Sequence, residues 1–161
     1  MENSKLIETF YESFQKRDFK GMNQCYHREV LFYDPVFGQM NYQEVCAMWH
    51  MLTQGAKKFE LTYRMVEADS HFGSVEWHAE YTYKGIMGRI NFVQNQVKAK
   101  FEFKDNLIYR HTDEFDFEKW IQMALNPWGK FFCKNTFFQS QIQKKARMKL
   151  KAFIQDHREY H

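Results

Sequence analysis

The 161-residue sequence is poor in proline, glycine and cysteine, and it contains no long run of apolar residues. Its two prolines and seven glycines argue against a disordered chain and against a long linker between domains. No apolar run approaches the roughly 20 residues that a membrane-spanning helix needs. We therefore expect one folded domain without a transmembrane segment, large enough to bury a sizeable core.

The three cysteines, Cys25, Cys46 and Cys133, are far apart in the sequence and odd in number. They form no CxxC pair and lack zinc-ligand spacing, so we expect buried thiols in a reducing compartment and no metal site. The polar N-terminal residues MENSKLIETF have a helical pattern and not that of a signal peptide. The sequence therefore predicts a cytoplasmic protein.

The motifs of the commonest nucleotide-binding and hydrolytic enzymes are also missing. The sequence contains no P-loop, GxGxxG, GxSxG or HExxH motif. Its net charge of +3 is too small to predict nucleic-acid binding. We therefore expect neither a cofactor nor a nucleic-acid partner.

Aromatic residues, in contrast, are abundant. They make up 19% of the chain and include 17 phenylalanines, more than a minimal core requires. This excess predicts either an aromatic-lined cavity or a large oligomer interface, because both use apolar surface.

Residues 29–52 have the pattern of a short strand, a turn and an amphipathic helix. Asp34 stands where the strand ends, and Pro35 after it holds this position in an extended or turn conformation. Asn41 begins the helix, which carries Trp49 on its apolar face. An aspartate between a buried strand and this helix predicts the floor of a pocket.

The rest of the chain divides into helical and alternating patterns. Helices are predicted over about residues 4–15, over a short segment that Asp18 caps and that includes Tyr26, and after Asp116. Four strands are predicted between residues 59 and 115, with turns at three segments: 71–74, 84–89 and 105–106. Helices separated from strands in this way predict an α+β domain, with helices over the concave face of a curved antiparallel sheet, a cone-shaped α+β barrel.

The C-terminal part adds an apolar loop over residues 126–138 and an extra helix over about residues 136–156. Five basic residues of this helix are expected to form a solvated face, with an anionic partner or a membrane surface as the alternative: Lys144, Lys145, Arg147, Lys149 and Lys151.

The order of elements, and above all FYDPVFG after a two-helix start, resembles the nuclear transport factor 2-like superfamily. That superfamily includes ketosteroid isomerases and SnoaL-like polyketide cyclases. The sequence is most similar to uncharacterised SnoaL-like bacterial proteins that share the DPVFG and MWxML patterns. The resemblance implies a SnoaL-like domain over residues 1–125, with residues 126–161 as an extension of the same domain.

The resemblance also implies candidate catalytic residues. Asp34 matches the aspartate of the isomerase DPV motif. The two oxyanion-stabilising groups of isomerases do not carry over, because their positions fall at Phe10 and near Ala99. The RHTDEFD segment is similar to the H-x-D-x-x-D ending of SnoaL-like members. Cyclases of the family use a carboxylate on this strand as acid or base, which implies roles for His111 and Asp113.

Each candidate has a structural alternative. Asp34 either accepts a proton or stabilises the Asp-Pro turn. His111 and Asp113 lie two residues apart on one strand face, so they either orient an imidazole for proton transfer or form a buried pair that fixes strand register. Four further residues are expected to face the pocket as ligand contacts or core residues: Trp49, Tyr81, Asn95 and Phe101.

Two functions are compatible with these patterns. The first is an isomerase-, cyclase- or dehydratase-like enzyme in which Asp34 moves a proton on a small apolar molecule. The second is a non-catalytic module that uses the same pocket residues to bind a lipophilic ligand or a protein partner. A homodimer is expected in both cases, with the polar outward residues of the long strands at its centre and the extra C-terminal segment adding apolar area. The outward residues include Glu76, His78, Lys98 and Lys100.

Overall fold

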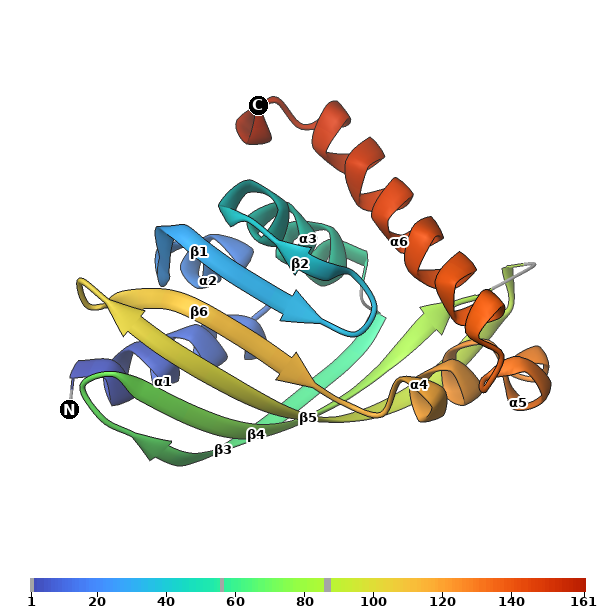
Figure 1. Ribbon diagram of the computed structural model, residues 1–161, viewed down its shortest axis with the longest axis horizontal. Coiled ribbons are helices and arrows are strands. Elements are labelled where there is room, and N and C mark those ends of the chain that lie inside the picture. The colour runs from blue at the N-terminus through green and yellow to red at the C-terminus, as the bar shows by residue number, and fades with distance from the viewer. Residues whose placement is uncertain (1, 56, 86–87) are drawn as a thin grey trace.

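The computed structural model describes residues 2–55, 57–85 and 88–161. Six strands form one curved sheet, and Figure 1 shows the long strands bending around the first helices. The helices are α1 (Glu2–Gln15), α2 (Phe19–Gln24), α3 (Tyr42–Gly55), α4 (Phe117–Ala124), α5 (Trp128–Phe132), α6 (Thr136–Asp156) and the 3-10 helix η2 (Arg158–Tyr160). The strands are β1 (Tyr26–Asp34), β2 (Gly38–Met40), β3 (Lys57–Ala68), β4 (Phe72–Lys84), β5 (Ile90–Lys104) and β6 (Leu107–Glu114).

The strand order is β2-β1-β6-β5-β4-β3, and the sheet is open, with β2 and β3 at its edges. All neighbouring strands pair antiparallel except β1 and β6, which are parallel. The predicted α+β fold, with a curved and mostly antiparallel sheet, is confirmed.

The turn between β3 and β4 occupies residues 69–71, whereas the sequence predicted residues 71–74. The Asp69 carboxylate accepts hydrogen bonds from the backbone N–H groups of His71 and Phe72, each at 2.7 Å. Gly73, which the sequence placed in the turn, belongs to β4. A Cβ atom at Gly73 would lie 2.8 Å from Cδ1 of Ile7. This glycine therefore allows α1 to approach the sheet closely.

The prediction that Tyr26 lies on the second helix was wrong. Asp18 does cap that helix, accepting a hydrogen bond from the N–H of Gly21 at 3.1 Å, but α2 ends before Cys25. The N–H of Ile108 on β6 donates to the carbonyl of Cys25 at 2.8 Å. This bond brings the chain into the sheet, and Tyr26 begins β1.

The segment around Asp34 has the predicted local structure. The side chains of Asn41 and Glu44 each accept a hydrogen bond from the backbone N–H of the other at 3.0 Å, which caps α3. Gly38 has a φ of +71°, a conformation that favours glycine, and it turns β2 back beside β1. These features hold Asp34 at the end of β1.

The main core lies between the sheet and helices α1 and α3. Its largest fully buried side chains are mostly aromatic or aliphatic, and they come from all three elements. They include Ile7, Phe10, Tyr11, Phe32, Met48 and Phe101.

The segment predicted as an apolar loop is partly helical, because α5 occupies residues 128–132. The N–H of Gly129 donates to the carbonyl of Leu125 at 2.8 Å, and a Cβ atom at Gly129 would clash with the backbone of Ile121. The glycine thus lets α5 pack directly on α4. No helix in the described part of the chain is long and apolar enough to cross a membrane.

A second core lies beyond Asp34, under α4, α5 and the first half of α6. Its buried residues are Val36, Val93, Trp120, Ile121, Ala124, Leu125 and Cys133. The side chain of Gln143 on α6 donates to the carbonyl of Pro35 at 2.9 Å, and Arg147 pairs with Glu44 at 2.7 Å. Helices α4–α6 therefore cover the end of the sheet that carries Asp34.

Candidate active site

Asp34 is buried, with 8% of its surface exposed. Its Oδ1 atom accepts hydrogen bonds from the backbone N–H groups of Val36 at 2.9 Å and Phe37 at 2.6 Å. Burial raises the pKa of this carboxyl from an ordinary value of 3.8 to about 7. The hydrogen bond from Phe37 opposes the rise in pKa, and the nearby charge of Asp113 adds to it. Asp34 thus combines a turn-forming role with a carboxyl that titrates near neutral pH.

His111 and Asp113 form a hydrogen-bonded pair on the inner face of β6, as their spacing predicted. Nε2 of His111 lies 3.0 Å from Oδ1 of Asp113, and Nδ1 lies 2.7 Å from the hydroxyl of Tyr26. The indole N–H of Trp49 donates to the same hydroxyl at 3.0 Å. The indole N–H of Trp77 lies 3.4 Å from Oδ1 of Asp113. These five side chains form one continuous polar network, in which Trp77 is half-buried and the other four are buried.

Aromatic rings enclose the imidazole of His111, which is 1% exposed. The ring of Phe101 is closest, with the two centroids 4.4 Å apart. The other enclosing rings are those of Phe10, Tyr26, Phe32 and Trp49. Side chains therefore fill the space around the pair.

Two tyrosines that the sequence analysis did not select belong to this region, Tyr11 and Tyr26. The Tyr11 hydroxyl is buried without a hydrogen-bond partner among the described residues. Burial, followed by the charge of Asp113, raises the pKa of Tyr11 well above its ordinary value and keeps the phenol protonated. The sequence did contain a signal for Tyr11, since it lies on the apolar face of α1 at helical spacing from Ile7 and Phe14.

Three of the four predicted ligand contacts lie in the two cores. Trp49 and Phe101 pack around His111 in the main core. Tyr81 packs against both cores, and its hydroxyl accepts a hydrogen bond from the Trp120 indole at 2.9 Å. Burial raises the pKa of Tyr81 to about 12, with the charge of Asp34 as a further contribution. Tyr81 is thus electrostatically coupled to Asp34.

Asn95, the fourth predicted contact, faces inward on β5 but lies toward α4. It lines a hollow with other residues of β5, with one residue of β4, and with α4 and its N-cap, namely Gln94, Gln96, His78, Asp116, Lys119, Gln122 and Met123. Among the described residues, no side-chain hydrogen bond joins Asn95 to the His111 network.

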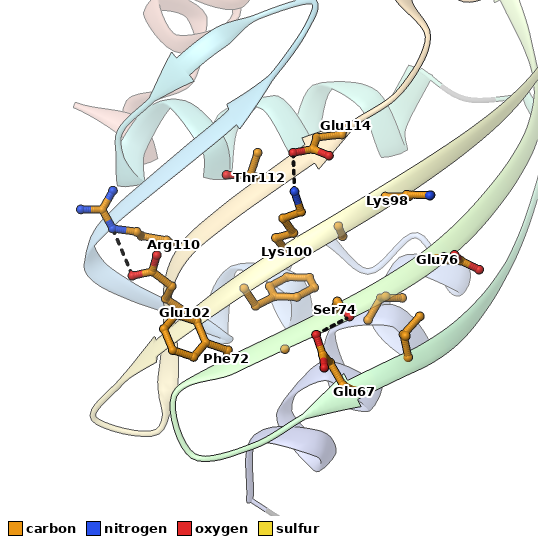
Figure 2. Close-up of a pocket in the computed structure, with 15 residues that line it drawn as sticks. Glu67, Phe72, Ser74, Glu76, Lys98, Lys100, Glu102, Arg110, Thr112 and Glu114 are labelled. Carbon is orange, nitrogen blue, oxygen red and sulfur yellow. Dashed lines mark hydrogen bonds and ion pairs between the residues drawn. The ribbon is translucent and has the colours of Figure 1, made fainter.

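A second hollow, of about 660 Å³, lies on the outer face of the sheet. Figure 2 shows its charged side chains. Lys100 forms an ion pair with Glu114 at 2.8 Å, and Arg110 forms one with Glu102 at 3.3 Å. Neither hollow is lined by Asp34, His111 or Asp113. Within residues 2–55, 57–85 and 88–161, no group of three or more His, Cys, Asp or Glu side chains could hold a metal ion.

The family model described as a SnoaL-like domain matches residues 7–111 of this chain. The chain belongs to the SnoaL-like family. No curated protein sequence matches this SnoaL-like protein.

Solved structures share the fold at low sequence identity. A proposed polyketide cyclase from Silicibacter sp. TM1040 is 20% identical, with a TM-score of 0.66, over 75% of this chain and 93% of that chain. A nuclear transport factor 2-like protein of unknown function from Burkholderia pseudomallei is 18% identical, with a TM-score of 0.64, over 77% and 98% of the two chains. An LEH-like epoxide hydrolase from M. tuberculosis is 19% identical, with a TM-score of 0.58, over 81% and 93%. These likenesses establish the fold.

Proposed function

We propose that this SnoaL-like protein is a cofactor-independent enzyme of isomerase, cyclase or dehydratase type that moves a proton on a small apolar substrate. Asp34 is the principal proton acceptor. The observation that carries this proposal is a buried carboxyl with a pKa of about 7. A general base works best when its pKa lies near the operating pH, and burial in an apolar site is one way to reach that value.

His111 and Asp113 are the proposed assisting pair. Asp113 contributes directly, because its charge raises the pKa of Asp34. The hydrogen bonds of His111 fit a tautomer that donates from Nε2 to Asp113 and accepts at Nδ1 from Tyr26. A proton can therefore be held along the Tyr26–His111–Asp113 chain while Asp34 changes its ionisation state.

Substrate must reach Asp34 through the cover formed by α4, α5 and α6. This cover packs on Val36 through the apolar second core, and at its edge it makes polar contacts such as the bond from Gln143 to the carbonyl of Pro35. Displacement of the cover would expose Tyr81, and a substrate would then have to displace the rings of Trp49 and Phe101 to reach His111. Asn95 is a proposed contact on the α4 side.

A non-catalytic lipophilic-ligand or protein-interaction module is the second candidate. The observation that favours it is the packing around His111, whose two ring nitrogens already have partners and whose faces are covered by aromatic rings. In this alternative the polar network around His111 only stabilises the core. The protein then binds a ligand or a partner but transfers no proton.

Deuterium uptake at the carbon next to a carbonyl separates the two candidates. A panel of cyclic ketones of increasing size is incubated with protein in D₂O, and exchange is followed by NMR. We expect exchange with the wild-type protein that rises through neutral pH, and background exchange with Asp34→Asn. Equal exchange rates for the two proteins across the panel, together with saturable ketone binding by both, would assign the protein to the non-catalytic class.

We also propose that the protein is a cytoplasmic homodimer that associates through the outer face of the sheet. Its three cysteines are free and buried, which suits a reducing compartment. The outer face combines ion pairs with exposed apolar side chains, among them Phe72 and Phe92, which are 58% and 53% exposed. Sedimentation of the protein at micromolar concentration tests this, and a Phe72→Glu/Phe92→Glu variant should shift it toward the monomer.

A further inference from the structure

The sequence from Lys119 to Gln155 carries charge of one sign only. The whole chain has 23 Lys and Arg and 20 Asp and Glu, and this segment holds eight of the basic residues and none of the acidic ones. The remaining residues hold 15 basic and 20 acidic side chains, so the formal charge of the rest of the protein is negative. The segment includes most of α4, all of α5 and nearly all of α6. A strongly cationic region is thus joined to an acidic body.

The same segment exposes large apolar side chains. Of the eleven large apolar residues that are exposed in the described structure, five lie here: Trp128, Phe131, Phe132, Phe137 and Met148. Phe131 and Phe137 are the most exposed of the eleven, at 79% and 72%. Figure 1 shows α5, which carries three of these residues, beside the end of α6 that carries Phe137. Aromatic side chains therefore gather at one corner of the molecule.

Helix α6 continues this surface along its outward face. Leu150 is buried against the protein, whereas Phe137, Lys144, Met148 and Lys151 are all exposed. These four residues follow one another at intervals of seven, four and three positions, which aligns them along one side of an α-helix. The outward face of α6 thus alternates apolar and cationic side chains.

We infer that α5 and the outward face of α6 dock on the surface of a lipid bilayer that contains anionic lipid. Exposed Trp, Phe and Met side chains enter the boundary between headgroups and acyl chains, and the lysines around them face the lipid phosphates. Five exposed lysines serve this contact: Lys130, Lys134, Lys144, Lys145 and Lys151. The cationic segment, with no acidic side chain, complements an anionic surface over its whole length.

Two other occupants fit less well. A two-fold contact with a second copy would bring the same surface against itself and oppose lysine with lysine. Nucleic-acid-binding surfaces favour arginine, because its planar guanidinium group donates two hydrogen bonds at once to a phosphate or a base. Arg147 is the only arginine of the segment, and Glu44 already engages it at 2.7 Å.

Docking would turn the covered end of the sheet toward the bilayer, because α5 and α6 form part of the cover over the second core. An apolar substrate dissolved in lipid would then lie next to the elements that must move to admit it. This consequence rests on the proposed function, whereas the docking itself does not depend on Asp34.

Vesicle flotation with the full chain tests the inference. The vesicles are phosphatidylcholine mixed with phosphatidylglycerol, or phosphatidylcholine alone. We expect binding to the mixed vesicles only, and a fall in affinity of at least about tenfold when NaCl is raised from about 0.1 M to about 0.5 M. The fluorescence of Trp128 should shift to shorter wavelength on binding, and Trp128→Phe should lose this shift.

Pairs of variants distinguish binding through this surface from an effect of net charge alone. Lys144→Gln/Lys145→Gln/Lys151→Gln and Phe131→Ser/Phe137→Ser should each weaken vesicle binding at least about tenfold. The matched controls Lys5→Gln/Lys16→Gln/Lys57→Gln and Leu52→Ser, whose side chain is exposed on α3, and also Asp34→Asn, should bind like the wild type. Circular dichroism and sedimentation establish that each variant keeps its fold and oligomeric state.

Three outcomes would overturn the inference. The first is an intact, folded protein that does not bind the mixed vesicles. The second is an equal loss of binding in the surface variants and their matched controls, which would reflect net charge alone. The third is that the surface variants lose self-association or retention on single-stranded RNA while the wild type ignores vesicles, which would assign the surface to a second copy or to nucleic acid.

Discussion

Nε2 of His111 lies 3.0 Å from Oδ1 of Asp113, and both side chains point from β6 toward the helices. If this nitrogen donates in the neutral ring, the opposite nitrogen accepts, and the Tyr26 hydroxyl at 2.7 Å is its donor. The Tyr26 oxygen in turn accepts from the indole of Trp49. One hydroxyl therefore satisfies two buried groups.

Tyr26→Phe should destabilise the protein by about 3 kcal/mol, because the change leaves a buried indole N–H and a buried imidazole nitrogen without partners. The free energy of unfolding, measured with urea, checks this. Tyr33→Phe on the same strand is the control, since Tyr33 is 47% exposed and its loss should change stability by less than about 0.5 kcal/mol. Equal effects of the two variants would show that the network contributes little to stability.

Asp34 should make the protein less stable as the pH rises from about 4 to about 7. Between these values the folded protein keeps a proton that the unfolded chain has lost, so stability falls with rising pH. Above pH 7 both states are ionised and this dependence ends. The total change approaches about 4 kcal/mol, because one pKa unit corresponds to about 1.4 kcal/mol.

Asp34→Asn tests this dependence directly. An amide oxygen can still accept the N–H groups of Val36 and Phe37, but it does not titrate in this range. The variant should therefore be more stable than the wild type at pH 8 and differ little from it at pH 4. A variant that is less stable than the wild type at pH 8 would contradict the raised pKa.

Gly73→Ala should destabilise the protein by about 1–3 kcal/mol, because its Cβ would lie 2.8 Å from Cδ1 of Ile7 and 3.2 Å from Phe103. Urea unfolding measures the effect, and adding Ile7→Val, which removes the clashing methyl group, should recover part of the loss. Gly55→Ala is the matched control. No atom lies within 4 Å of a Cβ there, and the change should stabilise the protein by about 0.4–1 kcal/mol.

Features that depend on neighbours in the chain could be predicted from the sequence. Asn41 and Glu44 are three residues apart and satisfy each other, so their pattern alone predicts the start of α3. Alternation placed His111 and Asp113 on one face of a strand, and the structure confirms that this face is the inner one. The sequence likewise predicted that Asp34 lies at the end of a strand, before a turn that contains a glycine.

Features that depend on distant contacts could not be predicted. Tyr26 belongs to β1 because residues more than 80 positions later pair with it and bond its hydroxyl. Gly73 is required by a side chain on α1, and nothing near it in the sequence reveals that neighbour. The abundance of Phe predicted a cavity or an interface, but only packing shows that rings fill the space around His111.

Tyr11→Phe should leave the protein as stable as the wild type or stabilise it by about 1 kcal/mol, the opposite direction to Tyr26→Phe. The Tyr11 hydroxyl is buried without a partner among the described residues, so its removal relieves an unsatisfied polar group and keeps the ring stacked on Tyr63, 4.8 Å away. Urea unfolding of the two phenylalanine variants side by side makes the comparison. A loss of stability on Tyr11→Phe similar to that of Tyr26→Phe would mean that an ordered water molecule satisfies the hydroxyl, and polar space would then exist beside Asp113 in the core.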